Sequence, residues 1–155
     1  MDLYELIGFI IGDGNIFYSK KHRQYRLQLA GNAEEDYDYF QQIAEFLRPL
    51  SKNKVQLFIR KEKKGKCLRL MLQDKAFVEK LISIGIPAGK KTFTIEFPRN
   101  LTKDMENSLL RGLFEADGCL YFSKSKKNNY PTYPRIEICT SSKKLFEQVE
   151  AILSE

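Results

Sequence analysis

The sequence predicts an α+β fold in which an α-β-β-α-β-β-α unit occurs twice, the second time incompletely. Three observations predict it: apolar residues at helical spacing, pairs of alternating strand-like segments between them, and a restart of the same order near residue 107. With 155 residues, 43% of them apolar, the chain is long enough to bury a core. We expect residues 1–98 to form the first repeat and residues 99–155 to form a second repeat that is incomplete at its C-terminus.

The first repeat is expected to begin with a buried helix over residues 3–13 that ends at Gly14. Alternation of apolar and polar residues then predicts two hairpins, with strands over residues 15–19 and 24–29 and over residues 54–62 and 66–72.

A helix is expected after each of these hairpins. Asn32 and Glu35 resemble a capping box for the first helix, which closes at Pro49. Asp74 is expected to cap the second helix, and Gly85 is expected to stop it.

The second repeat is expected to contain a helix over residues 107–117, strands over 119–123 and 135–140, and a helix from about Ser142. Two alignments support a true duplication. The segment Tyr39–Ile43 matches Leu145–Val149, and the pair Asp13-Gly14 matches Asp117-Gly118.

The first helix of each repeat carries small residues four positions apart. Gly8 and Gly12 in the first repeat correspond to Gly112 and Ala116 in the second. Residues at this spacing lie on one helix face, and small side chains there let two backbones approach closely. We therefore expect these two helices to pack against each other.

Each of these helices ends in an acid, Asp13 or Asp117. A carboxylate at the negative C-terminal end of a helix is costly, and a second one nearby makes it more so unless a cation lies between them. Hard oxygen ligands without His or Cys nearby favour Mg²⁺ over zinc. The alternative is that each Asp-Gly pair only forms a turn after its helix.

The segments Leu6–Gly14 and Leu110–Gly118 resemble the paired signature motifs of the LAGLIDADG homing endonuclease family. The resemblance implies a pseudo-twofold protein whose signature helices form the central interface and whose strands form a saddle over double-stranded DNA. It also implies a metal-dependent DNA endonuclease that uses Mg²⁺ or Mn²⁺ and is encoded within an intron or intein.

By the same resemblance, Asp13 and Asp117 bind the metal and are catalytic, and Lys91, with Lys90 as the alternate, is the catalytic lysine. One departure concerns the Gln or Lys that many family members carry near the end of the second strand. The equivalent positions here are Gly31 and Ser141, and Asn32 is the possible substitute.

Alternation places Ile16, Tyr18, Leu27 and Leu29 on the core side of the first hairpin. Side chains on the opposite face, together with one basic turn residue, are expected to contact DNA, since Arg and Gln suit guanine and adenine in the major groove. These residues are Asn15, Phe17, Ser19, Lys21, Gln24, Arg26, Gln28, Gln56, Arg60, Arg69, Tyr121, Ser123, Arg135 and Glu137.

The charge pattern also favours an anionic partner, because the formal net charge is +6 and the pI is about 9.2. Lysines gather in the expected hairpin turns, where they suit phosphate contacts. They are Lys20, Lys21, Lys63, Lys64, Lys66, Lys124, Lys126 and Lys127.

Other classes remain as alternatives. A non-cleaving protein of the same fold, either an RNA maturase for intron splicing or a DNA-binding regulator, is the main one. A complete intein is disfavoured by Met1 and Glu155 at the two ends. No membrane role is expected, because the apolar run over residues 6–11 is too short for a span and no basic amphipathic helix is present.

Cys67, Cys119 and Cys139 lack CxxC spacing, which favours a reducing compartment. We expect a cytoplasmic, nucleoid-associated or organellar protein that is not secreted. It is expected to be monomeric if the second repeat is complete, whereas an incomplete repeat leaves an apolar face that favours dimerisation.

Overall fold

The computed structural model describes residues 1–62, 65–124 and 131–154. The expected turn lysines Lys63, Lys64, Lys126 and Lys127 lie outside these residues. The elements are α1 (Leu3–Asp13), β1 (Gly14–Ser19), β2 (Gln24–Asn32), α2 (Tyr37–Leu47), a 3₁₀ turn (Arg48–Leu50), β3 (Val55–Glu62), β4 (Gly65–Gln73), α3 (Lys75–Ile84), α4 (Lys103–Asp117), β5 (Gly118–Lys124), β6 (Pro131–Ile138) and α5 (Lys143–Leu153).

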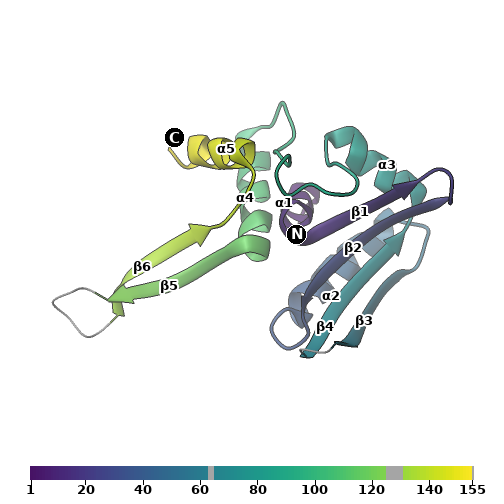
Figure 1. Cartoon of the computed structure of the whole chain (residues 1–155), viewed down its shortest axis with the longest axis horizontal. Helices are drawn as coiled ribbons and strands as arrows, with labels where there is room; N and C mark the ends of the chain where they lie inside the picture. Colours follow the sequence, from purple (N-terminus) through teal and green to yellow (C-terminus); the bar gives the residue numbers. More distant parts are fainter. Residues whose placement is uncertain (63–64, 125–130, 155) are drawn as a thin grey trace.

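Strands β1 to β4 form one antiparallel sheet in the order β1-β2-β4-β3 (Figure 1). The two hairpins, β1–β2 and β3–β4, are therefore joined where β2 pairs with β4. Apolar side chains alternate toward one face, as the sequence predicts, and they are almost fully buried: Ile16, Leu27, Leu29, Leu68, Leu70 and Leu72.

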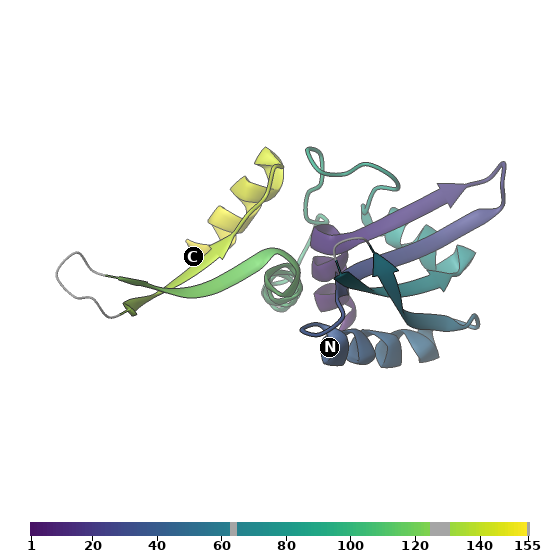
Figure 2. The same cartoon turned by 60° about the horizontal axis from the view of Figure 1, so that its bottom comes forward.

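Helices α2 and α3 cover this apolar face of the sheet (Figures 1 and 2). Each has an amphipathic pattern whose apolar side is buried, with Phe40, Ile43 and Leu47 on α2 and Phe77, Val78 and Leu81 on α3. Helix α2 contacts β3 and β4, whereas α3 contacts β2. Helix α2 thus covers the hairpin that follows it in the chain, and α3 covers the first hairpin.

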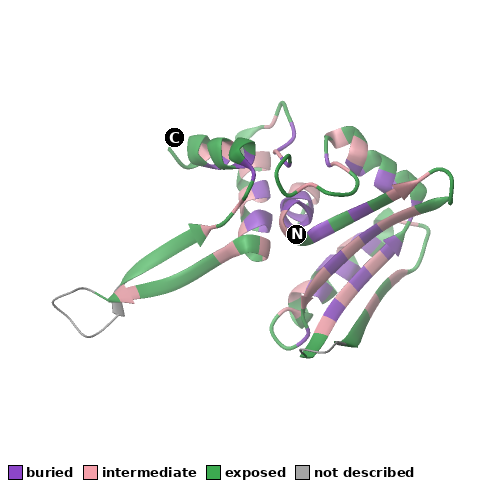
Figure 3. Cartoon of the chain, in the orientation of Figure 1, coloured by how far each residue is buried: buried purple, intermediate pink, exposed green. Residues whose placement is uncertain are grey.

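Helices α1 and α4 lie side by side at the centre of the molecule (Figure 2). The four-stranded sheet lies on one side of the pair, and the separate hairpin β5–β6 lies on the other side with α5. Figure 3 shows the consequence: buried positions alternate along the large sheet, whereas the second hairpin is exposed over most of its length.

Two expected boundaries at helix starts are wrong. The capping box at Asn32 does not form, because β2 continues to Asn32 by pairing with Cys67 and α2 begins only at Tyr37. The helix expected from residue 107 begins at Lys103, because the hydroxyl of Thr102 accepts a hydrogen bond from the Met105 N–H and caps an earlier turn.

The last strand is also shifted toward the N-terminus, to Pro131–Ile138 instead of residues 135–140. Its pairing with β5 ends where Ile138 lies opposite Gly118, and the chain then turns toward Ser142, which caps α5. No helix within the described residues has the length and apolar content needed to cross a membrane.

Candidate active site and nucleic-acid interface

The small residues of α1 and α4 lie at the contact between the two helices. A Cβ atom on Gly8 would overlap the carbonyl group of Leu109, and one on Gly112 would overlap the carbonyl of Glu5. Farther along, a Cβ on Gly12 would overlap the side chain of Ala116. The helices approach so closely that their backbones touch, which brings their C-terminal ends together.

Asp13 and Asp117 are the last residues of these two helices. The next residue in each case is a glycine in extended conformation, Gly14 or Gly118, whose N–H donates to the preceding helical turn while the chain enters a strand. The matched Asp-Gly pairs therefore place both carboxylates at the junction of the two helices and the two sheets.

The environment of these carboxylates disfavours their charged form. Partial desolvation by the surrounding helix ends raises the pKa of Asp13, and the nearby Asp117 raises it further. Desolvation also raises the pKa of Asp117, and the Lys91 ammonium opposes the shift at both acids. Both residues are exposed on one side, so the site is open to a ligand while it remains electrostatically unfavourable without a cation.

Lys91 supplies a positive charge at this junction. Its Nζ donates to the carbonyl oxygen of Gly12 at 2.7 Å and to that of Ile11, both at the C-terminal end of α1. Burial lowers the pKa of the lysine, and both acids raise it. Lys90, the alternate, is exposed. The structure thus brings Lys91 together with the two acids.

The loop that carries Lys91 is held at two points. Gly89 adopts a φ of 83°, which favours glycine, and its N–H donates to the Ile16 carbonyl of β1 at 2.8 Å. Beyond the lysine, the N–H of Ile95 donates to the Lys91 carbonyl at 2.8 Å and closes a turn. These bonds direct the lysine toward the end of α1.

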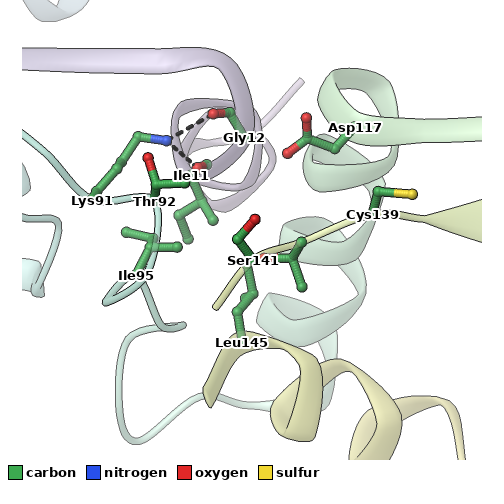
Figure 4. Close-up of a pocket in the computed structure, with 10 residues that line it drawn as sticks. Ile11, Gly12, Lys91, Thr92, Ile95, Asp117, Cys139, Ser141 and Leu145 are labelled. Atoms are coloured by element: carbon green, nitrogen blue, oxygen red, sulfur yellow. Dashed lines mark hydrogen bonds between the residues drawn. The ribbon is translucent and has the colours of Figure 1, made fainter. Parts of the chain in front are cut away.

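A cavity of about 320 Å³ lies on the Asp117 side of the junction (Figure 4). Lys91 and Asp117 face it from opposite walls, and Ser141 contributes a hydroxyl from the segment between β6 and α5. Thr92, Cys139 and Thr140 also line it, and none of these three was predicted as a site residue. From this segment, the resemblance to the LAGLIDADG family had singled out only Ser141.

The positions near the end of the second strand differ between the repeats. Ser141 lines the cavity, whereas the Asn32 side chain accepts a hydrogen bond from the Glu34 N–H at 2.9 Å. Gly31 leaves no room for a side chain, since a Cβ there would lie 2.6 Å from the Asp36 carboxylate. Asp36 also raises the pKa of Asp13 and was missed from the sequence.

The predicted DNA-contacting residues of the first repeat share the sheet face opposite the core. Cross-strand partners lie on the same face, and the register pairs Asn15 with Gln28, Phe17 with Arg26, and Ser19 with Gln24. The face continues across the sheet through Gln56, Arg60 and Arg69. Lys21 lies exposed in the β1–β2 turn.

Two residues of this face were not predicted. Met71 lies opposite both Gln28 and Gln56, and Phe58 lies opposite Arg69. Alternation along the strands already places both on the face opposite the core, but their apolar character left them out of the predicted DNA contacts. A further feature of the face is Arg26, which lies 5.6 Å from the centre of the Phe17 ring and has a buried Nε without a hydrogen-bond partner.

The predicted residues of the second hairpin also share one face. Tyr121 lies opposite Arg135, and its hydroxyl donates to the Glu137 carboxylate at 2.6 Å. The Nε of Arg135 donates to the Ser123 hydroxyl at 3.3 Å. The four residues thus form two hydrogen-bonded pairs on one face.

The oxygen donors at the junction fit a divalent cation. Asp13 and Asp117 provide hard oxygen ligands whose pKa values are raised mainly by partial burial, and Mg²⁺ is commonly held by one or two carboxylates together with substrate phosphates. The described residues contain no group of three or more His, Cys, Asp or Glu side chains arranged for metal binding.

Sequence comparisons add two findings. Residues 104–155 match the family described as "LAGLIDADG-like domain". The chain is also 30% identical over 162 aligned residues to the replication factor C small subunit of Methanocaldococcus jannaschii; the match covers 97% of this chain and 9% of that protein.

Solved structures with a similar fold are homing endonucleases. A variant of I-DmoI, in complex with its target DNA and in the presence of Mn, has a TM-score of 0.62 at 21% identity, covering 97% of this chain and 72% of that one. The homing endonuclease I-WcaI, bound to its DNA recognition sequence, has a TM-score of 0.50 at 22% identity, covering 81% and 54%. I-DmoI with DNA and Ca has a TM-score of 0.51 at 20% identity, covering 75% and 56%.

The fold is therefore that of a LAGLIDADG homing endonuclease, in the predicted α+β class. The resemblance of the chain to the LAGLIDADG family, predicted from its two motifs, is confirmed by the family match in residues 104–155 and by these structural neighbours.

Proposed function

We propose that this protein is a site-specific endonuclease that hydrolyses phosphodiester bonds in double-stranded DNA with the help of Mg²⁺ or Mn²⁺. The observation that carries the proposal is the junction of α1 and α4. There, two partly desolvated carboxylates from matched helix ends lie near one lysine.

Asp13 and Asp117 would hold the metal. Bound there, a divalent cation supplies Lewis-acid activation of water and neutralises charge at the scissile phosphate. The close backbone contact at Gly8 and Gly112 fixes the distance between the two acids, so the site is preorganised by the helix pair.

Lys91 would provide electrostatic stabilisation of the charge that develops on the phosphate. Its hydrogen bonds to the end of α1 hold the ammonium in place before substrate arrives, which lowers the cost of reorganisation. Ser141 and Thr140 would position water or phosphate oxygens in the cavity.

The polar sheet faces would bind the DNA. Their arginine and amide side chains match the acceptor and donor pattern of the major groove. The unpartnered Nε of Arg26 supports this assignment, because a buried donor without a partner is unfavourable until a ligand accepts from it.

The match to a segment that makes up 9% of a replication protein supports an origin inside a host protein. An endonuclease encoded within an intein would give a match of this kind. We propose this origin over an intron, which the present similarity does not favour.

The test is to incubate the purified protein with a randomised duplex library and to sequence the DNA ends that it produces. Mg²⁺ should yield enriched ends and Ca²⁺ should not. Asp13→Asn should remove the ends while binding persists. Asp104→Asn, which changes an exposed acid in the first turn of α4, is the matched control and should leave cleavage intact.

Specific binding without Mg²⁺-dependent ends would contradict cleavage and favour the alternative of a non-cleaving nucleic-acid-binding protein. Ends that survive Asp13→Asn would contradict the assignment of the site.

A further inference from the structure

The polar face of the large sheet is organised in rows, because the strand register sets which side chains lie next to one another. Strand β2 is an inner strand of the order β1-β2-β4-β3 (Figure 1), so its side chains lie in the middle of this face. Arg26 and Gln28 of β2 both belong to the face, and each has a partner on β1 and another on β4. The surroundings of these two residues differ in chemistry.

Arg26 is oriented by its neighbours in the absence of DNA. Its partners are Phe17 on β1 and Gln73 on β4, and its guanidinium carbon lies 5.6 Å from the centre of the Phe17 ring. Stacking on an aromatic ring fixes the plane of a guanidinium, and the buried Nε shows that the side chain lies along the sheet. A guanidinium held in this way suits the two acceptors, N7 and O6, that guanine presents in the major groove.

Gln28 lies in a row of uncharged side chains. Its partners are Asn15 on β1 and Met71 on β4, and Met71 in turn lies opposite Gln56 on β3. A side-chain amide offers the acceptor and donor that match N6 and N7 of adenine, and an apolar neighbour suits the methyl group of thymine. This row therefore favours an A·T base pair.

The strand geometry sets the spacing and the order of the two positions. Residues two apart on one strand are separated by about 7 Å, which corresponds to about two base pairs of duplex DNA. Gln28 lies opposite Asn15, which follows Asp13 closely, whereas Arg26 lies opposite Phe17, farther along β1. Gln28 is thus the nearer of the two to the candidate site.

We propose that the first repeat recognises a DNA half-site with two defined positions: an A·T base pair read by Gln28 and, about two base pairs farther from the cleaved bond, a guanine read by Arg26. Phe17 is the positioning residue for Arg26. The location of the cut rests on the proposed function, whereas the identity and spacing of the two bases depend only on DNA binding.

The test is to select duplexes from a randomised library with the full chain in Ca²⁺ without Mg²⁺, and to sequence the bound DNA. The unsubstituted chain should enrich a guanine and an A·T base pair about two base pairs apart. Arg26→Gln should lower the preference for guanine by about tenfold or more and favour adenine there, because an amide replaces the guanidinium. Gln28→Ala should remove the A·T preference and leave that for guanine.

Two further variants separate base reading from general effects. Arg48→Gln is the matched control, because Arg48 is exposed directly after α2, which covers the opposite face of the sheet; it should leave both preferences unchanged. Phe17→Leu should weaken the preference for guanine at the Arg26 position and leave the A·T preference, a split that a general loss of stability does not produce. Circular dichroism shows whether each variant is folded.

An Arg26→Gln variant that keeps the preference for guanine would overturn the proposal, as would affected positions that are adjacent or more than about four base pairs apart. A selection that enriches no sequence would overturn it too. Binding with the expected preferences but without cleavage in Mg²⁺ supports this inference and contradicts only the proposed cleavage. Cleavage in Mg²⁺ with the guanine nearer to the cut than the A·T base pair contradicts only this inference.

Discussion

The first and second repeats place the same kind of helix in two different environments. Phe40 and Leu47 of α2 are 0% exposed, whereas their counterparts on α5, Phe146 and Leu153, are 55% and 68% exposed. The sequences of the two helices are equally amphipathic. The comparison shows that the apolar pattern of a helix determines which face can pack against other elements. Whether that face is buried depends on which elements are present to cover it.

The two repeats also contribute different residues to the candidate site. Lys91 comes from the segment after α3, and the described part of the second repeat has no counterpart of it. Conversely, the cavity beside Asp117 is lined by residues that precede α5, where the first repeat has Gly31 and Asn32. The two acids are matched, but the groups around them are not.

The largest expected effect is a difference in how much α2 and α5 contribute to the free energy of unfolding. Phe40→Ala should lower the free energy of unfolding by about 3–5 kcal/mol, because it empties a fully buried ring site. Phe146→Ala should change it by less than about 0.5 kcal/mol in the monomer. Chemical denaturation of both variants at low protein concentration measures the difference, and equal losses would contradict it.

Because different residues surround the two acids, we expect the two DNA strands to be cleaved at different rates. Lys91→Met should slow hydrolysis of one DNA strand by about 100-fold, the usual cost of losing one preorganised group of this kind. Nicked DNA should then accumulate, which strand-specific labelling detects. Lys90→Met is the control and should leave the rates unchanged, since Lys90 is exposed and outside the cavity. Equal slowing of both strands would argue against an asymmetric role.

The contact that joins the two repeats is the next to test. Gly112→Ala should lower the free energy of unfolding by about 1–3 kcal/mol, because its methyl group meets the Glu5 carbonyl and the helices must separate. Glu115→Ala, on an exposed position of the same helix, should have little effect. Thermal unfolding compares the two, and an unchanged midpoint for Gly112→Ala would show that the helices are not so closely packed.

The smallest expected effect concerns pH. Because the folded state raises the pKa of Asp13, the stability linked to this group is present below the ordinary carboxyl pKa and is lost as pH rises through the raised value. Asp13→Asn should therefore give a small rise in the unfolding midpoint at neutral pH that vanishes in acid.

Thermal scans over a pH series measure this effect. Adding Ca²⁺ should raise the midpoint of the unsubstituted protein more than that of Asp13→Asn, since the cation relieves the same repulsion. Destabilisation by Asp13→Asn at neutral pH would contradict the direction of the shift.

Much of the local structure was predictable because it depends on short-range patterns. The hairpins follow from alternation at Leu68, Leu70 and Leu72, and α3 is capped by Asp74 and ended by Gly85 as expected. The predicted ends of helices and strands were wrong where contacts with distant segments determined them. Asn32 continues β2 because Cys67 of β4 is available to pair with it, a partner far away in the sequence.

The features of the candidate site were likewise partly predictable from short-range patterns. The spacing of Gly8, Gly12, Gly112 and Ala116 was sufficient to predict that two helix ends meet, because close helix packing requires small residues at that spacing. Met71 and Phe58 were left out of the predicted DNA contacts because they are apolar, although alternation along their strands already places them on the face opposite the core.

The sequence by itself determined the order of the elements, their apolar faces, the pairing of the signature helices and the placement of an acid at each helix end. These depend on periodicity, small-residue spacing and capping, which act within a few turns of chain. Only the tertiary structure decided that Lys91 reaches the end of α1, that Ser141 lines the cavity, and that the apolar side chains of Ile136, Phe146 and Leu153 are exposed. These outcomes depend on contacts between segments far apart in the chain, whose geometry no local pattern encodes.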